Sequence, residues 1–295
     1  MYVRQSLKAR LNRIKTLADV TAIGIFDSGI GGLSLVEACE KTMPGTRILY
    51  VADTAHQPYG QKTAQQVVDY SRRICDFFQS HGVQAILVAC STASAVAVPV
   101  LQKSLRIPLL GLLNEGWVRD VLKKTRNRRI GILATTLTTQ TGTFAEFLQQ
   151  RAGEDVQVFG QAAPSLIGLI SEGKLQEDVL MPVIRRDLCS LLDQGIDTLV
   201  VGCTHFNFIL SQLEQVAGAH VKIVNPKDWA TMEMAERLGW LSPSFGPTLP
   251  SPLRGEGKDE GSAFYATGDV PSFQALARKL WRPNVIFQPL EFVLA

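Results

Sequence analysis

Two of the five cysteines in this 295-residue chain stand where reactive groups collect in proteins that alternate strands and helices. Cys90 follows the apolar run Ala85 to Ala89, and Cys203 follows the run Thr198 to Gly202. Small polar residues come next in both places, and those after Cys90 can begin a helix. A helix N-terminus stabilises a thiolate, so we expect a thiol pKa lowered from about 8.5 towards neutrality. Such a group can accept or return a proton near pH 7.

The other three cysteines have apolar surroundings in the sequence. Cys75 lies on the apolar face of a predicted helix at 64–80, Cys189 lies among leucines, and Cys39 lies in a helical stretch. We expect all three to be small buried hydrophobic residues. Either Cys90 or Cys203 alone could also be a core residue, whereas the two at matching strand ends favour acid–base chemistry.

A glycine-rich loop and a rigid turn follow the first two apolar runs. Asp27 closes the first run, and the segment 28–32 (SGIGG) leads towards a helix. Its backbone N–H groups can hold a phosphate or a carboxylate, although the same residues also suit a tight turn. The segment is neither a Walker motif nor a strict GxGxxG pattern. Asp53 and Thr54 end the second run, and the turn at 58–60 (PYG) then offers a phenol, though most such turns are structural.

A metal site is the alternative use of Cys203, because His205 lies two residues away. No other group of Cys, His or acidic residues has metal-ligand spacing in the sequence, so we expect no metal. His56 lies alone in a loop, and His81 and His220 lie at the ends of predicted elements. We expect these three imidazoles to be solvated.

The elements that must position these residues are short apolar runs with amphipathic stretches between them. Runs without alternation suit strands that are covered on both faces. We expect strands at Ala22–Phe26, Ile48–Ala52, Ala85–Ala89, Ile107–Leu113, Arg129–Leu133, Val156–Phe159, Thr198–Val201 and Val221–Val224. The segment 64–80 carries apolar residues at helical spacing. This alternation predicts an α/β fold with mainly parallel sheets.

The chain also contains a weak internal repeat. The segment 23–26 (IGIF) resembles 130–133 (IGIL), and 86–90 (ILVAC) resembles 199–203 (LVVGC). The offsets of 107 and 113 residues are similar, and the order is the same. We expect two related α/β domains, each with one cysteine at a strand end. Chance similarity between buried strands is the alternative explanation.

Composition excludes several classes of protein. Apolar residues make up 46% of the chain, which is too much for a disordered protein. The 30 basic and 27 acidic residues leave a net charge of +3, which gives no broad basic surface for nucleic acid. The odd number of cysteines without a Cys-x-x-Cys pair, and the lack of a secretory apolar run, indicate a cytoplasmic protein with reduced thiols. The uncharged segment 82–102 is long enough to span a bilayer, but its polar residues favour a buried strand and a turn, so we expect no membrane association.

Two segments fall outside the repeating pattern. Residues 1–20 carry five basic side chains and one acidic side chain, which predicts an appended basic helix. Residues 242–262 contain four Pro, four Gly and four Ser, which predicts an exposed loop. We therefore expect a first domain at 21–115 plus 226–295 and a second domain at 116–225.

Five segments, in this order, resemble the cofactor-independent glutamate racemases of the aspartate/glutamate racemase superfamily. They are FDSGIGGLSL at 26–35, ADTAHQPYG at 52–60, VACSTASA at 88–95, VGCTHFNFIL at 201–210 and FYATGD at 264–269. The resemblance runs from about residue 22 to residue 281. It implies two similar α/β domains related by pseudo-symmetry, with the active site in the cleft between them. It also implies interconversion of L- and D-glutamate without pyridoxal phosphate or another cofactor, supplying peptidoglycan precursors in a bacterium.

The resemblance assigns roles to individual positions. Inverting a tetrahedral carbon needs a base on one face and an acid on the other, and Cys90 and Cys203 match these two residues. Asp27 is implied to support Cys90, His205 to support Cys203, and Glu172 to be an acidic neighbour on the second side. Positions implied to hold the substrate are Asp27, Ser28, Tyr59, Gly60, Ser91, Thr92, Thr135, Thr138, Thr204 and His205. The partners expected are glutamate and an anionic regulator at the basic extension or the domain cleft, and a homodimer is left open.

Two positions depart from the family pattern. Ser91 stands where the family has Asn after the first cysteine, so an amide that can both donate and accept is lost. A ligand group left without its partner costs on the order of 1–3 kcal/mol, unless a water replaces the amide or the substrate differs. Ala163 and Pro164 replace a Cys-Pro pair, which should affect neither base. The alternatives are a racemase of aspartate or another carboxylate, a related decarboxylase, which the second cysteine disfavours, and a catalytically weak binding protein that keeps the cleft.

Overall fold

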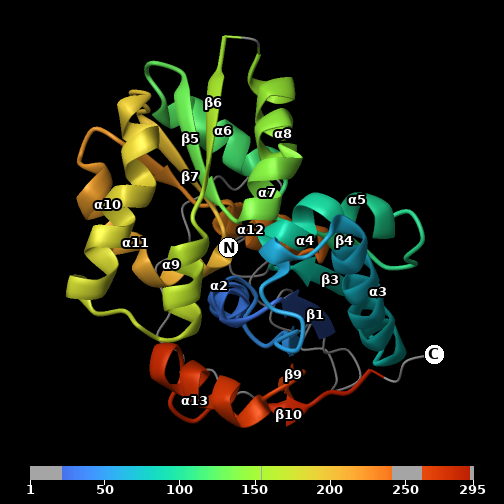
Figure 1. The fold of residues 1–295 in the computed structure, drawn as a ribbon. Helices are drawn as coiled ribbons and strands as arrows, with labels where there is room; N and C mark the ends of the chain where they lie inside the picture. Colours follow the sequence, from blue (N-terminus) through green and yellow to red (C-terminus); the bar gives the residue numbers. More distant parts are fainter. Residues whose placement is uncertain (1–21, 154, 241–260, 293–295) are drawn as a thin grey trace, which may run out of the picture.

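The computed structural model of the chain describes residues 22–153, 155–240 and 261–292. The predicted basic extension at 1–20 lies outside these ranges, as does the predicted loop at 242–262 apart from its last two residues. Within the described ranges the chain forms two parallel sheets with helices around them (Figure 1).

The first sheet has six strands in the order β10-β9-β2-β1-β3-β4. Every strand pairing in it is parallel. Its strands are β1 (Ala22–Asp27), β2 (Arg47–Ala52), β3 (Ala85–Val88), β4 (Leu109–Leu110), β9 (Ala263–Ala266) and β10 (Gln288–Pro289). The register pairs Asp27 with Ala52 and Phe26 with Val88, so the carboxyl ends of the three central strands lie at one edge.

The second sheet has four strands in the order β6-β5-β7-β8, and its pairings are also parallel. Its strands are β5 (Arg129–Ala134), β6 (Gln157–Ala162), β7 (Thr198–Gly202) and β8 (Lys222–Val224). Ala134 pairs with Gly202, so the residues after β5 and β7 also lie together. The predicted α/β class with two parallel sheets is confirmed. Each predicted domain contains all the strands of one sheet. The domain limits themselves stay predictions.

Helices connect the strands, as parallel pairing requires. They are α2 (Leu33–Thr42), α3 (Ala64–Ser80), α4 (Ser91–Val96), α5 (Val98–Leu101), α6 (Glu115–Lys124), α7 (Thr136–Thr141), α8 (Thr143–Ala152), α9 (Pro164–Ser171), α10 (Glu177–Asp193), α11 (Leu210–Ala217), α12 (Pro226–Arg237) and α13 (Val270–Leu280). Short 3-10 helices lie at Ile30–Gly32 (η2), Tyr59–Gln61 (η3) and Thr204–Ile209 (η4). Figure 1 shows α10 and α11 on one side of the second sheet and α6 and α8 on the other.

Helix α3 has the bounds that its periodicity predicts, and its capping explains why it begins where it does. The Thr63 hydroxyl accepts a hydrogen bond from the Gln66 N–H, and the Gln66 side chain accepts one from the Thr63 N–H. This capping box satisfies two N–H groups that the first turn leaves unpaired. Val67, Ile74 and Phe78 are fully buried on the inner face.

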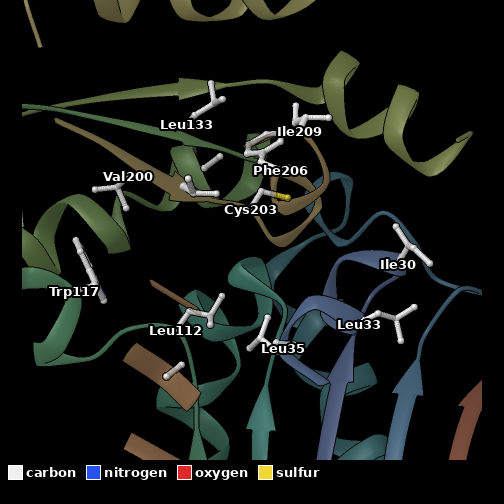
Figure 2. Packing of buried hydrophobic residues seen from close by; sticks show 14 of the residues in the cluster. Ile30, Leu33, Leu35, Leu112, Trp117, Leu133, Val200, Cys203, Phe206 and Ile209 are labelled. Atoms are coloured by element: carbon white, nitrogen blue, oxygen red, sulfur yellow. The ribbon is translucent and has the colours of Figure 1, made fainter. Parts of the chain in front are cut away.

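One apolar cluster runs through both halves of the molecule. Figure 2 shows Leu35 and Leu112 from the first half in the same cluster as Leu133, Val200 and other residues of the second. Shared packing of this kind favours a fixed relation between the two halves, because separating them would expose apolar surface. In the described part of the chain no helix is long and apolar enough to span a membrane.

Some strands differ from those predicted. The strand expected at 107–113 is reduced to the two residues of β4, since Pro108 lacks an N–H donor and β4 pairs only with β3. Strands β9 and β10 were not predicted, because four and two residues are too short to give a periodic signal.

The expectation for the lone cysteines is confirmed for two of them and wrong for the third. Cys39 and Cys75 are buried, whereas Cys189 is exposed. The buried positions of α10 include Ile184, Leu188 and Leu191, and Cys189 lies one residue off that face.

Candidate active site

Cys90 lies between the end of β3 and the start of α4, and it is 5% exposed. Its Sγ–H donates to the Ser28 hydroxyl at 3.8 Å. Burial, followed by the negative charge of Asp27, raises the pKa of Cys90 to about 12, although N–H groups of Ala93 and Ser28 act in the opposite direction. The expectation of a thiol pKa near neutrality is therefore wrong, because removal from water outweighs the backbone donors of a six-residue helix.

Cys203 lies between the end of β7 and the 3-10 helix η4, and it is 4% exposed. Figure 2 shows it beside Phe206 in the apolar cluster. Burial raises the pKa of Cys203 well above its usual value, with the N–H of His205 as the largest opposing influence. The sulfur lies 3.8 Å from Nδ1 of His205. Burial lowers the pKa of His205, so its imidazole is neutral at pH 7 and can accept a proton.

Ser28 connects Asp27 to Cys90 by hydrogen bonds. Asp27 is fully buried, and its Oδ1 accepts from the Ser28 N–H at 2.6 Å and from the Ser28 hydroxyl at 3.3 Å. Its Oδ2 accepts from the Thr204 hydroxyl at 2.8 Å, across the boundary between the two sheets. A chain of hydrogen bonds therefore runs from Cys90 through Ser28 to Asp27, and Thr204 joins it from the Cys203 side.

The glycine-rich loop after Asp27 makes close contact with the second half of the molecule. A Cβ at Gly31 would lie 2.4 Å from the Thr204 hydroxyl oxygen and 2.7 Å from the backbone nitrogen of His205. A side chain at Gly31 would therefore collide with the residues next to Cys203. This close approach explains a glycine at this position better than either the anion-binding or the simple turn interpretation.

Three threonines form a hydroxyl cluster between the halves. The Thr92 hydroxyl lies 3.0 Å from that of Thr135 and 3.2 Å from that of Thr138, and the Thr135 hydroxyl donates to Thr138 at 2.9 Å. All three are at least 90% buried. Gly60 lies against the same cluster, since a Cβ there would be 2.5 Å from the Thr135 Cβ.

Tyr59 and Ser91 complete the wall around the thiols. The Tyr59 hydroxyl donates to Asp53 at 2.6 Å. The Ser91 hydroxyl is buried, and among the described residues it has no hydrogen-bond partner. A buried hydroxyl without a partner is costly, so a bound molecule or a water would stabilise it.

Nearly all of the predicted site residues line one small cavity of about 10 Å³. The cavity is lined by Asp27, Ser28, Pro58, Tyr59, Gly60, Cys90, Ser91, Thr92, Thr135, Ile167, Cys203, Thr204 and His205. Its volume suits at most about one water molecule, so an amino acid can enter only if the two halves separate or the walls move. A groove of about 400 Å³ shares Pro58, Gly60, Thr135 and Ile167 with the cavity and so continues it outwards.

Glu172 is not gathered with the other predicted residues. It lines the outer groove and forms an exposed ion pair with Lys174 at 2.6 Å. His56 also differs from its expectation: it is half-buried, its Nδ1 lies 2.9 Å from Asp53, and its ring stacks on Tyr70. His81 and His220 are exposed, as expected.

Asp53 and Thr267 have no role predicted from the sequence, although both lie directly behind the wall formed by Tyr59. The Thr267 hydroxyl donates to Asp53 at 2.7 Å. The available signal was the polar ending of the segments ADT and ATGD, each of which follows a strand of the first sheet.

Comparisons with known proteins place the chain in one racemase family. A family model described as Asp/Glu/hydantoin racemase matches residues 33–234. The glutamate racemase of Desulforudis audaxviator is 35% identical over 255 residues, covering 86% of this chain and 92% of the relative. A crystal structure of a glutamate racemase isoform from Bacillus anthracis matches with a TM-score of 0.80 at 25% identity, covering 93% of this chain and 99% of that one. The glutamate racemase of Francisella tularensis, in complex with D-glutamate, matches with a TM-score of 0.77 at 25% identity, covering 94% and 98%. The chain therefore belongs to the Asp/Glu/hydantoin racemase family, among its glutamate racemases.

Proposed function

We propose that this chain interconverts L- and D-glutamate by proton transfer at Cα between two thiols, without a cofactor. The observation that supports it most is the pair of buried cysteines on one cavity, each at the carboxyl end of a strand in a different sheet. Racemisation needs a proton removed from one face of Cα and another delivered to the opposite face. Cys90 and Cys203 come from opposite halves of the molecule and suit that requirement.

In the proposed reaction one cysteine is a thiolate and the other a thiol when substrate binds. The thiolate takes the α-proton, and the thiol gives its proton to the opposite face of the resulting carbanion. The two cysteines have then exchanged protonation states, and the product is the other enantiomer. No other atom is gained or lost, so the same pair serves both directions.

The neighbours of each thiol orient it and contact its proton. His205 is neutral and its Nδ1 lies 3.8 Å from the Cys203 sulfur, so it is placed to receive the proton of that thiol, although burial opposes the charged form of both groups in the free protein. Cys90 donates to Ser28, whose own hydroxyl and N–H are oriented by Asp27. We therefore assign Asp27 and His205 as supports of the two thiols. Glu172, which lies in the outer groove, would contact a substrate on its way to the cavity rather than a bound one.

The cavity offers polar groups that match glutamate. Two carboxylates require donors, and the hydroxyls of Ser28, Thr92, Thr135 and Thr204 provide them from both halves. The predicted residue Thr138 does not line the cavity but contacts Thr92 and Thr135 through its hydroxyl. Tyr59, Gly60 and Ser91 line the same space and are assigned to binding. Because these hydroxyls now bond to one another or to Asp27, substrate would exchange existing hydrogen bonds for new ones.

The cellular setting is proposed from the same activity. D-glutamate made by this chain would supply peptidoglycan synthesis in the bacterial cytoplasm, where unpaired cysteines remain reduced. An anionic regulator at the basic residues 1–20 or at the domain cleft, and assembly as a homodimer, are further proposals. Deleting residues 1–20 without changing activity, stability or the response to cell-wall nucleotides would contradict a regulatory role of that extension.

One assay tests the proposed function against its alternatives. Each enantiomer of glutamate and of aspartate is incubated with the protein in deuterated water, and circular dichroism and α-deuterium incorporation are followed. We expect loss of optical activity with deuterium at Cα for both glutamate enantiomers. Faster racemisation of aspartate would indicate a different carboxylate substrate, and binding without deuterium incorporation would indicate a binding protein.

A further inference from the structure

Thr267 ties the C-terminal part of the chain to the loop that carries Tyr59. Its hydroxyl donates to Asp53 Oδ1 at 2.7 Å and accepts from the Ala55 N–H at 2.9 Å. Its backbone N–H donates to the Ala52 carbonyl at 3.0 Å, and its carbonyl accepts from the Thr54 hydroxyl. One residue at the end of β9 therefore holds four successive residues at the end of β2.

Among the groups that Thr267 contacts, the Asp53 carboxylate depends most on its hydrogen-bond donors. It is a carboxylate that is 1% exposed, and among the described residues no lysine or arginine forms an ion pair with it. Its oxygens accept from the hydroxyls of Thr267 and Tyr59 and lie 2.9 Å from His56 Nδ1. A buried carboxylate held by so few donors depends on each of them.

Tyr59 carries the effect of Asp53 to the cavity. Burial and the neighbouring Asp53 raise the pKa of the Tyr59 phenol well above its usual value. The phenol therefore keeps its proton and donates a hydrogen bond to Asp53. Tyr59 and Gly60 both line the cavity that contains the two thiols. Gly60 also packs against Thr135, so movement of this segment would disturb the hydroxyl cluster as well.

We propose that Thr267 is a positioning residue for the racemase: its hydroxyl fixes Asp53, and through it the Tyr59–Gly60 wall of the thiol cavity. The inference rests on the proposed function and adds a residue outside the 33–234 segment that the family model matches. It also gives the C-terminal segment a part in the active site, since Thr267 lies 214 residues from Asp53 in the sequence.

The test compares two substitutions that differ by one hydroxyl. Thr267→Val keeps the shape of the side chain and removes the hydroxyl, whereas Thr267→Ser keeps the hydroxyl. We expect Thr267→Val to lower kcat/KM for glutamate about tenfold, mainly by raising KM, because a donor to a buried carboxylate is lost. Thr267→Ser should stay within about twofold of the wild type.

A matched control separates positioning from general stability. Thr198 is fully buried and also donates to a carboxylate, that of Asp197 at 2.9 Å, but it lies at the end of β7 remote from Cys203. Thr198→Val should lower the melting temperature and leave KM unchanged. If Thr267→Val behaves in the same way, or if Thr267→Ser is as impaired as Thr267→Val, the proposal is overturned.

Two further measurements keep the result interpretable. If Thr267→Val does not fold, Thr267→Ala removes the hydroxyl without placing a second methyl against Asp53, and the same KM rise is expected. In a Tyr59→Phe background the Thr267 substitution should add less than it does alone, since both act on one wall; full additivity would contradict the proposal.

A ligand-free readout distinguishes failure of this inference from failure of the proposed function. The rate at which iodoacetamide modifies Cys90 should rise severalfold in Thr267→Val and stay unchanged in Thr267→Ser, because a displaced wall exposes the thiol. If the wild type does not racemise glutamate, the proposed function is wrong. Equal modification rates in the two variants overturn the positioning role in either case.

Discussion

The two halves of the cavity place different groups beside their thiols, Cys90 and Cys203. Both cysteines follow a strand at the carboxyl edge of a parallel sheet, and burial raises the pKa of both thiols. Beside Cys90 lies a hydroxyl backed by a carboxylate, Ser28 and Asp27. Beside Cys203 lies a neutral imidazole, His205. Equivalent positions in two similar sheets therefore do not imply equivalent proton acceptors.

The two neighbouring groups differ in how they can interact with the proton of each thiol. An imidazole nitrogen can accept the thiol proton directly, although burial opposes the resulting ion pair in the free protein because it raises the pKa of Cys203 and lowers that of His205. A serine hydroxyl can only stabilise the thiolate by donating to it, while Asp27 orients that serine. We therefore expect the two supports to fail differently when removed, although the thiols themselves should be equally necessary.

The largest effect should come from removing either thiol. Cys90→Ser and Cys203→Ser should each lower kcat for glutamate racemisation by about 10²–10⁴-fold, because a hydroxyl is a far weaker acid than a thiol. Circular dichroism of either enantiomer measures the rate. Cys189→Ser, at the exposed cysteine, is the matched control and should keep full activity. Full activity in Cys90→Ser or Cys203→Ser would remove the two-thiol mechanism.

The next largest effect should come from the supports, and here the two halves can be told apart. Asp27→Asn and His205→Asn should each lower kcat/KM about ten- to hundredfold. Because the equilibrium constant between enantiomers is one, this loss must be equal in both directions for each variant. The asymmetry appears instead in the isotope effects of α-deuterated substrates, since the weakened base makes proton removal slower for only one enantiomer.

The two variants should therefore show their larger isotope effect with opposite enantiomers. That outcome would pair Asp27 with Cys90 and His205 with Cys203. If both variants show it with the same enantiomer, the pairing is wrong, and Asp27 acts chiefly through its hydrogen bond with Thr204.

The sequence predicts where the two thiols lie, but it does not predict whether their pKa values are raised or lowered. The runs before Cys90 and Cys203 predict strands, and parallel strands place their carboxyl ends together, so both thiols could be placed correctly. The direction of the thiol pKa shift could not be predicted, because a helix start is a local feature whereas burial depends on the packing of both halves. Cys189 shows the same limit, since neighbouring leucines do not fix which face of a helix a residue occupies.

The residues that the sequence could not connect are those joined over long distances. Thr267 meets Asp53 only because β9 pairs with β2, and β9 is too short to be recognised in advance. Glu172 is the converse case: the resemblance implied a place near the second thiol, and the structure places it in the outer groove. Whether it contacts substrate stays a prediction.

The pH dependence of thiol modification should sharpen the comparison between the halves. With a Cys90 pKa of about 12, the thiolate fraction in the free protein rises about tenfold for each pH unit throughout the range from 7 to 10. Iodoacetamide modification of Cys90, followed by mass spectrometry at constant protein stability, should rise accordingly. A plateau below pH 9 would show that Ser28 and the backbone donors outweigh burial.

The smallest expected effect concerns the residues that follow the two thiols, Ser91 and Thr204. The Thr204 hydroxyl donates to Asp27, whereas the Ser91 hydroxyl has no partner among the described residues. The two hydroxyls at matching positions therefore differ in their partners within the described part of the chain. Ser91→Asn supplies an amide that can both donate and accept, so KM for glutamate should fall by up to about tenfold, with little change in kcat.

Ser91→Ala tests whether the native hydroxyl contacts substrate at all. It removes a hydroxyl that has no hydrogen-bond partner among the described residues, so stability should change little, and a raised KM would show that the hydroxyl binds glutamate. An unchanged or raised KM in Ser91→Asn would mean that the cavity has adapted to serine. In that case the asymmetry between the halves extends from the proton acceptors to substrate binding, because the larger amide would then compete with glutamate for the same space.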